Sequence, residues 1–315
     1  MSPLVSVIIP TRNRPLLAAR AVKSGLQQTL KEIEVIVVID GVDEATHQEL
    51  SKIDDPRFQI VQLSASLGGG GARNAGVDRS KGEWIAFLDD DDEWLPKKLE
   101  KQLAAAKASQ YSCPIISCYL TARTPKGEFK YPRRFPRSEE HLSEYLLARN
   151  SFSFGEGLIQ TSTIFTKKEL LQQVQFKAGL AKHQDWDWLL RVNTLAGVGI
   201  EFVPEPLTIW YCWEKRPTTS TISNWKNSLT WIRNNRHLVT PRAYAAFVMI
   251  QAGAQAAYQR EWQEFLPLLK EAINNGKPKA IDFWLYLAMW LVPRDTRRTI
   301  RGLFSRKKTQ TIKSA

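Results

Sequence analysis

The sequence contains little cysteine and little histidine, with three and four of them among its 315 residues. Cys113, Cys118 and Cys212 form no CxxC pair and stand near no histidine cluster, so nothing in the spacing indicates a zinc site. An odd and sparse set of cysteines is typical of reduced thiols in a cytosol. With 43% hydrophobic residues, we expect a globular chain with one large core, or one core and an appendage.

The apolar runs near both ends are short. The N-terminal one has about six residues and no basic lead, so it predicts neither a signal peptide nor a membrane anchor, and we expect the protein to stay where it is made. The run IDFWLYLAMWLV, residues 281–292, is apolar except at Asp282. As a helix it would be about 18 Å long. That is too short for the roughly 30 Å hydrocarbon core of a bilayer.

Positive charge gathers after this run, within a chain of net charge +12. No recognisable nucleic-acid-binding module accompanies it. An apolar, Trp-bearing segment before a basic run suits attachment to an anionic cytoplasmic leaflet, with about 1 kcal/mol from each nearby basic residue. A buried core helix followed by a disordered tail is the alternative, and both stay open. The basic residues, against a single Asp295, are Arg294, Arg297, Arg298, Arg301, Arg306, Lys307, Lys308 and Lys313.

A dinucleotide-binding fingerprint is also missing. The stretch LGGGGARNAG, residues 67–76, has no GxGxxG spacing and follows the third predicted strand, which argues against a Rossmann oxidoreductase. Two interpretations of the glycines remain. They form a flexible turn, or they let the backbone approach a phosphate-bearing ligand, with Arg73 one helical turn further on.

The first part of the chain alternates Val- and Ile-rich runs with helical patterns, which predicts an α/β domain with a parallel sheet covered on both faces. Ligands of such sheets bind beyond the carboxyl ends of the strands. Thr11–Arg14, Asp40 and Asp89–Asp92 all fall at such ends. The predicted strands are 4–10, 34–40, 58–63 and 83–89, and the predicted helices lie around 15–28, at 43–53 and from 71 to 80.

After Gln110 the pattern predicts further, mixed strands of the same sheet, and from about Ser223 it predicts helices only. Trp225, Trp231 and Trp262 occur at helical spacing and are interpreted as packing residues. Stacking of these rings on a sugar is the alternative.

The stretch GEWIAFLDDDDEW, residues 82–94, leads from an apolar strand directly into four aspartates. Carboxylates so close repel one another unless a positive group neutralises them, and a divalent cation with oxygen ligands is the usual one. A solvated acidic turn that caps a helix near Pro96 is the competing interpretation.

Asp185 stands near the start of a predicted helix in AGLAKHQDWDWLLRVNTLAG, residues 178–197. Asp185 and Asp187 could be no more than helix-start charges. Asp185 also lies where a carboxylate beside tryptophans can have its pKa adjusted to act as a general base.

Six motifs resemble, in order and at about the same spacing, those of family 2 glycosyltransferases with the GT-A fold, a Rossmann-like α/β fold. The resemblance covers roughly residues 4–213. The motifs are VSVIIPTRNR, EVIVVIDG, GGGGARNAG, GEWIAFLDDDDEW, HQDWDWLLR and FVPEPLTIWY.

The resemblance implies a nucleotide-sugar site. The family's DxD motif corresponds to Asp89, Asp90 and Asp91, and Asp91 would coordinate Mg²⁺ or Mn²⁺ on the donor diphosphate. Asp90 would face the ribose, and Arg73 would be a further donor contact. The loop after the first strand and an aspartate after the second would hold the base and ribose. They supply Thr11, Asn13, Arg14 and Asp40.

The family's Glu-Asp pair becomes Gln184-Asp185 here, so the Asp that would act as general base is kept and the Glu is not. Asp185 would accept the proton of an acceptor hydroxyl that attacks the anomeric carbon, with inversion. Other departures from the family's motifs weaken the prediction of the nucleotide contacts more than that of the metal contact. They are Ile39 and Val42, where relatives have Asp and Ser, and Ser66, where Asn is frequent.

The sequence thus predicts a metal-dependent, inverting glycosyltransferase that uses a nucleotide-sugar donor, with a leaning to UDP, and a glycan or lipid-linked acceptor in cell-surface polysaccharide synthesis. A nucleotide-sugar-binding protein without turnover is the alternative. We expect a cytoplasmic protein, in peripheral contact with the inner face of the cell membrane through residues 281–315, and no nucleic-acid partner. The predicted domains are 1–220, catalytic, 221–293, a helical appendage, and 294–315, a basic disordered tail.

Overall fold

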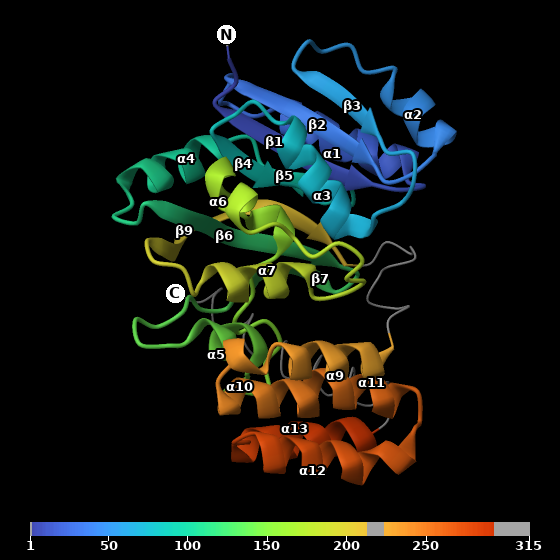
Figure 1. The fold of residues 1–315 in the computed structure, drawn as a ribbon, viewed down its shortest axis with the longest axis vertical. Helices are drawn as coiled ribbons and strands as arrows, with labels where there is room; N and C mark the ends of the chain where they lie inside the picture. The colour runs from blue at the N-terminus through green and yellow to red at the C-terminus, as the bar shows by residue number, and fades with distance from the viewer. Residues whose placement is uncertain (1, 213–223, 293–315) are drawn as a thin grey trace. The chain divides into compact units, whose positions relative to one another are not determined.

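The computed structural model describes residues 2–212 and 224–292 (Figure 1). The chain divides into two compact units, one of Met1–Leu146 with Gly155–Ile222 and one of Leu147–Phe154 with Ser223–Ala315. The predicted domain boundary at 220 and the predicted basic tail 294–315 lie outside the described residues.

The first unit is built on a sheet to which nine strands of the described chain contribute, and the predicted α/β fold is confirmed. β1, β2, β3 and β4 run parallel. β1, β2 and β4 are buried almost throughout, as the near-continuous apolar strands of a parallel sheet usually are, while β3 is partly exposed. Thr11 pairs with Ile39, so the residues that follow β1 and β2 emerge at one edge. The strands are β1 (Val5–Thr11), β2 (Ile33–Ile39), β3 (Phe58–Gln62), β4 (Trp84–Phe87), β5 (Asp92–Trp94), β6 (Cys113–Thr124), β7 (Gly127–Tyr131), β8 (Phe165–Lys167) and β9 (Val198–Tyr211).

The strand order is β3-β2-β1-β4-β8-β6-β9-β5, with β7 paired to β6. β8 joins β4 antiparallel, and β6 and β9 continue from it, so the predicted extension of the sheet by mixed strands is confirmed. Asp92, the last of the four aspartates, does not lie in a turn before a helix. It begins β5, which pairs antiparallel with β9.

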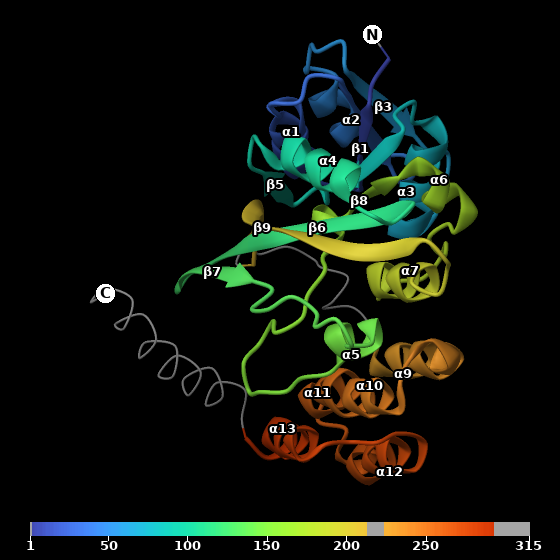
Figure 2. The same ribbon diagram turned by 90° about the vertical axis from the view of Figure 1, so that its left-hand side faces the viewer.

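Helices cover both faces of this sheet, as Figure 2 shows for α1 and α4 on one side and α3 on the other. Ala18 and Val22 of α1 and Leu103 of α4 join the larger apolar core, while Ala72 of α3 packs on Ile36 and Val38. The helices are α1 (Pro15–Leu26), α2 (Glu44–Leu50), α3 (Gly68–Arg79), α4 (Lys98–Ala108), α5 (Leu142–Leu147), α6 (Lys168–Gln173) and α7 (Gln184–Val192), with a 3₁₀ turn η1 (Thr161–Thr163).

Lys98 is fully buried at the start of α4. Its Nζ donates a hydrogen bond to Gln102 Oε1 at 2.6 Å and lies 3.8 Å from the ring centroid of Trp94. Burial away from water lowers the pKa of Lys98 from its ordinary value of 10.5 to about 7. The folded state therefore holds this amine without a compensating carboxylate among its hydrogen-bond partners.

We expect the free energy of unfolding to rise with pH between about 7 and 10.5, because in that window the unfolded chain binds the Lys98 proton and the folded chain does not. Lys98→Met removes this slope. In urea unfolding, the free energy of unfolding of the variant minus that of the wild type should therefore fall between pH 7 and about pH 9. Lys107→Met, an exposed position of the same helix, should show no such change. A pH-independent difference for Lys98→Met would contradict the assignment.

The second unit is helical, as the sequence predicts. Trp225 and Trp231 are buried as packing residues, whereas Trp262 is 54% exposed and packs only in part, on Trp290. The helices are α9 (Trp225–Asn234), α10 (Pro241–Ala246), α11 (Gly253–Tyr258), α12 (Phe265–Asn275) and α13 (Ala280–Leu291), with a π-helical segment η3 (Phe247–Ala252) and the 3₁₀ turns η2 (Arg236–Leu238) and η4 (Trp262–Glu264).

α13 corresponds to the apolar run before the basic sequence. It buries Leu285, Tyr286 and Trp290 but leaves Trp284 and Leu291 exposed, so the core-helix interpretation holds for one face only. None of the helices in the described part of the chain is both long and apolar enough to cross a membrane.

A buried ion pair joins α10 to α13 in this unit. Arg242 Nη1 lies 2.5 Å from Asp282 Oδ2, and the two side chains are 7% and 0% exposed. Arg242 Nη2 also donates to the carbonyl of Arg149 at 2.9 Å, and Asp282 accepts a hydrogen bond from the backbone N of Lys279 at 2.8 Å. The pair therefore ties both helices to the segment Leu147–Phe154.

Candidate active site

The predicted site residues of the first unit gather at the carboxyl edge of β1, β2 and β4. Thr11 Oγ1 donates to Asp90 Oδ2 at 2.7 Å, and Arg14 Nη1 lies 2.8 Å from Asp90 Oδ1 and 3.2 Å from Asp91 Oδ2. The loop after β1 thus meets the aspartates that follow β4, although 76 residues separate Arg14 from Asp90. The arginine supplies the positive charge that adjacent carboxylates require.

Asp90 and Asp91 form a turn, but it is largely withdrawn from solvent. Asp90 and Asp92 are 5% and 0% exposed, and Asp92 Oδ2 accepts hydrogen bonds from Ser162 at 2.6 Å and Gln160 at 2.8 Å. Burial raises the pKa of Asp90, while Arg14 and Thr11 act against that rise. The capping interpretation is wrong, because α4 begins at Lys98 and no side chain caps it.

Arg73 connects the aspartates that follow β4 with α7. Its Nη2 lies 2.6 Å from Asp89 Oδ1, and its Nη1 donates to Gln184 Oε1 at 2.6 Å. The Arg73 side chain is 9% exposed, so both contacts are largely shielded from solvent. Gln184, at the position of the family's glutamate, accepts from the arginine without adding a second negative charge.

The glycine run is helical and not a loop. α3 begins at Gly68, three residues before the predicted start. A Cβ on Gly71 would lie 2.4 Å from the Leu67 Cβ, and one on Gly69 would lie 2.9 Å from Gln184 Oε1. The run therefore lets the first turn of α3 approach its neighbours, and the flexible-turn interpretation is wrong.

Asp40 holds the start of that helix. Its carboxylate accepts hydrogen bonds from the backbone N of Leu67 at 2.7 Å, the backbone N of Gly68 at 3.0 Å and Ser66 Oγ at 2.6 Å. Arg12 Nη1 donates to the same Ser66 Oγ at 2.7 Å. Asp40 thus fixes the loop between β3 and α3 beside the loop after β1.

Asn13 lies in that loop after β1 with a left-handed backbone, at φ 55°. Its backbone N donates to Asp43 Oδ2 at 2.6 Å. Asp43 also caps α2 through the backbone N of Thr46 at 3.1 Å. Burial acts to raise the pKa of Asp43, but these hydrogen bonds act in the opposite direction, and the pKa lies below its ordinary value. Asp43 was not among the predicted site residues, although an aspartate at the start of a helical pattern is a recognisable cap signal.

Asp185, the predicted general base, and Asp187 have different environments on α7. Asp187 is fully buried, with Lys177 and Arg191 each at 2.8 Å, so its charge is structural. Asp185 keeps partial access to solvent, and its Oδ1 accepts a hydrogen bond from the backbone N of Trp186 at 2.9 Å. Burial raises the pKa of Asp185 to about 6, with a further upward contribution from Asp89 and a downward one from Arg73.

His183, immediately before α7, is not suited to proton transfer near neutral pH. Burial and the neighbouring Lys182 lower its pKa to about 3, so the ring is neutral. It stacks on Trp186 with 5.1 Å between ring centroids. A carboxylate with a pKa of about 6, such as Asp185, can act as a general base near neutral pH.

A cation cage made by the protein alone is not present: no group of three or more His, Cys, Asp or Glu side chains in residues 2–212 and 224–292 is arranged for a metal. Mg²⁺ in phosphate sites takes only one or two carboxylates and completes its shell with phosphate oxygens and water. Asp91 fits that mode better than Asp90, since its side chain is 17% exposed against 7%.

Comparisons with known proteins agree with this architecture. The amylovoran biosynthesis glycosyltransferase AmsB of Erwinia amylovora is 29% identical over 72% of this chain and 76% of its own length. The putative colanic acid biosynthesis glycosyl transferase WcaA of Escherichia coli is 38% identical over 61% of this chain and 66% of its own.

Among solved structures, Staphylococcus aureus TarS 1–349 in complex with UDP-GlcNAc superposes with a TM-score of 0.61 at 17% identity, over 93% of this chain and 82% of that one. That likeness shows a shared GT-A fold. Residues 6–173 match the model of glycosyl transferase family 2, which is more than half of the chain. The chain therefore belongs to glycosyltransferase family 2.

Proposed function

We propose that this protein is an inverting glycosyltransferase that moves a sugar from a nucleotide-diphosphate donor, a UDP-sugar, to a hydroxyl of a glycan or lipid-linked acceptor in cell-surface polysaccharide synthesis. The observation that carries the proposal is Asp185, a partly accessible carboxylate with a pKa near 6, close enough to Asp89 and Arg73 to respond to their charges. The names of AmsB and WcaA support the polysaccharide assignment, and the UDP-GlcNAc complex of TarS supports the donor class.

In this mechanism Asp185 accepts the proton of the acceptor hydroxyl as the oxygen attacks the anomeric carbon, on the face opposite the nucleotide. The bond from that carbon to the diphosphate oxygen breaks, and the nucleoside diphosphate leaves with the electron pair. One displacement inverts the configuration and needs no covalent enzyme intermediate. Asp187 cannot replace Asp185, because Lys177 and Arg191 already hold its charge.

The donor would bind to side chains that are already hydrogen-bonded or ion-paired to one another in the protein. Thr11, Asn13, Arg14 and Asp40 would contact the base and ribose, and Arg73 the diphosphate. Asp89 and Asp90 complete the proposed donor site. Arg14 and Arg73 are already oriented by these carboxylates, which reduces the side-chain ordering that binding requires.

Asp91 would hold Mg²⁺ or Mn²⁺, which when bound would neutralise charge on the leaving diphosphate. We further propose that the reaction takes place in the cytoplasm, at the inner face of the cell membrane. The basic sequence from Arg294 onward would attract anionic lipids there.

A thermal-shift screen of UDP-, GDP- and dTDP-sugars, with and without Mn²⁺ or Mg²⁺, tests the donor site. We expect one nucleotide class to raise Tm by roughly 5–10 °C at a hundredfold excess over Kd, in a metal-dependent way. Asp91→Ala should abolish the metal dependence, whereas the exposed Asp54→Ala should keep it. An unchanged metal dependence in Asp91→Ala would remove Asp91 from the role. No shift with any donor would contradict donor binding by the free protein.

A further inference from the structure

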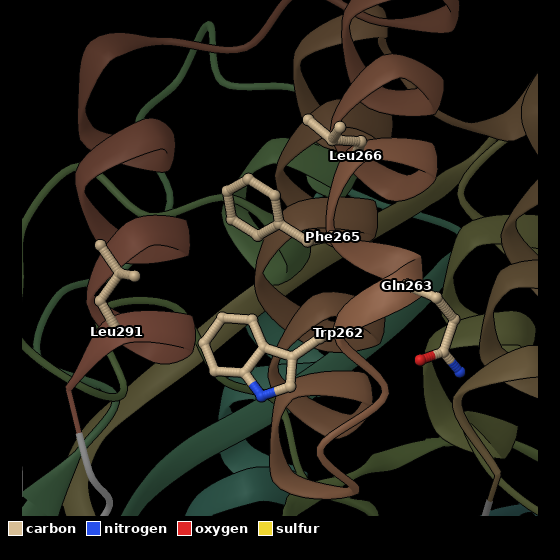
Figure 3. Close-up of a pocket in the computed structure, with 5 residues that line it drawn as sticks. All are labelled: Trp262, Gln263, Phe265, Leu266 and Leu291. Carbon is tan, nitrogen blue, oxygen red and sulfur yellow. The ribbon is translucent and has the colours of Figure 1, made fainter.

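An apolar surface lies where the start of α12 and the end of α13 meet. Trp262 and Leu266 are 54% and 58% exposed, and Leu291 of α13 is 65% exposed. With Gln263 and Phe265 these residues line an open pocket of about 340 Å³. Figure 3 shows Leu291 on one helix and the rings of Trp262 and Phe265 on the next, so the pocket joins the two helices.

The surface continues along α13. Trp284 lies seven residues before Leu291, hence on the same side of the helix, and is 64% exposed. Single exposed apolar residues are ordinary, but a contiguous group with two tryptophans marks an interaction site. Tryptophan favours the membrane–water interface, because its ring is apolar and its N–H is polar.

Charges of both signs flank this surface. Glu261 and Glu264, on either side of Trp262 and Gln263, are partly buried, and Glu261 accepts a hydrogen bond from Trp225 Nε1 at 3.1 Å. The exposed charges on α12 and just after it are positive. Lys270 is exposed and lies four residues after Leu266, on the same stripe of α12, and the exposed Lys277 lies just beyond the end of this helix. The acidic side chains Glu271 and Asp282 are paired with Arg233 and Arg242. Beyond α13 the sequence adds eight basic residues against one aspartate. A partner with an apolar layer beneath a negative surface fits this arrangement.

We propose that α12 and α13 bind the surface of an anionic phospholipid bilayer, with Trp262, Leu266, Trp284 and Leu291 in the interface and Lys270 and Lys277 facing the headgroups. Helices of 11 and 12 residues cannot cross the hydrocarbon core, so they lie along it. This proposal rests on the proposed function in one respect: binding to the bilayer would bring a lipid-linked acceptor to the enzyme.

Flotation of the full-length protein with vesicles tests this surface. We expect binding to phosphatidylglycerol–phosphatidylcholine vesicles, and weak binding to phosphatidylcholine alone. Trp262→Ser with Leu291→Ser should weaken binding to the anionic vesicles by about tenfold or more, because two large apolar side chains no longer enter the interface. The control Leu16→Ser with Phe152→Ser changes residues that are 73% and 63% exposed outside α12 and α13, and should bind like the wild type.

Equal binding of the Trp262/Leu291 variant and the wild type to anionic vesicles would overturn the proposal. Failure of the wild type to bind anionic vesicles would also overturn it. If instead the wild type is a dimer without vesicles and this variant a monomer, a second copy covers the surface and the lipid assignment is wrong. The donor-induced thermal shift of the same samples separates the two proposals. An intact shift without vesicle binding refutes the lipid surface alone, and vesicle binding without any shift refutes the donor site alone.

Discussion

Asp185→Asn is expected to lower turnover by about 10²–10⁴-fold while donor binding stays close to that of the wild type. Asparagine keeps the size of the side chain and an oxygen for the hydrogen bond from the backbone N of Trp186, but it cannot accept the acceptor's proton. Turnover is measured as release of nucleoside diphosphate, and donor binding as the thermal shift. Turnover within about twofold of the wild type would show that another group removes the proton.

The pH dependence of the wild type checks the same residue. Burial raises the pKa of Asp185 to about 6, so turnover should fall as the pH drops through about 6 and the carboxyl becomes protonated. Above that pH it should level off. The residual activity of Asp185→Asn should lack this fall. If it keeps the fall, the titrating group is another one.

Arg242→Met is expected to lower the free energy of unfolding of the helical unit by about 3–5 kcal/mol. The substitution leaves Asp282 buried without its counter-ion and removes the donor to the Arg149 carbonyl. Burial already raises the pKa of Asp282, and without Arg242 this carboxyl would rise further and tend to be protonated. Urea unfolding followed by circular dichroism measures the loss.

Arg233→Met is the matched control, because Arg233 pairs with Glu271 at 2.8 Å in the same unit but its side chain is 53% exposed. It should cost less than about 1 kcal/mol. Arg242→Met combined with Asp282→Asn should recover part of the loss, since no buried charge remains and the amide can still accept from the backbone N of Lys279. Equal losses for Arg242→Met and Arg233→Met would mean that burial of the pair has little energetic weight.

Much of the fold could be predicted from the sequence because its strands are nearly continuous apolar runs. All seven residues of β2 are buried, and in an α/β domain a short, continuous apolar run of this kind indicates a buried strand. Parallel strands then bring Thr11, Asp40 and Asp89 to one edge, so the general place of the site followed from chain order alone. β5, with only three residues, carried no periodic signal of its own.

The side-chain partners could not be predicted in the same way. Arg73 and Gln184 are 111 residues apart, and neither residue type determines that they meet. Asp40 was expected to help hold the base and ribose of the nucleotide, but nothing local indicates that its carboxylate also holds the start of α3. The predicted helix began at Gly71 and left Gly68–Gly70 outside it, as glycine's low helix propensity favours, whereas α3 begins at Gly68 and its first turn packs closely around Gly69 and Gly71.

The pairing of acids with arginines at the sheet edge also bears on how fast a donor arrives. Asp90 and Asp91 share Arg14, Asp89 has Arg73, and Arg20 lies 3.1 Å from Glu93. A nucleotide sugar is an anion, and an uncompensated acidic run would slow its approach. The three arginines offset part of the negative charge of that run, so the net charge of +12 acts on the incoming molecule against a weaker local repulsion, and its diffusional capture becomes quicker in dilute buffer than in concentrated salt.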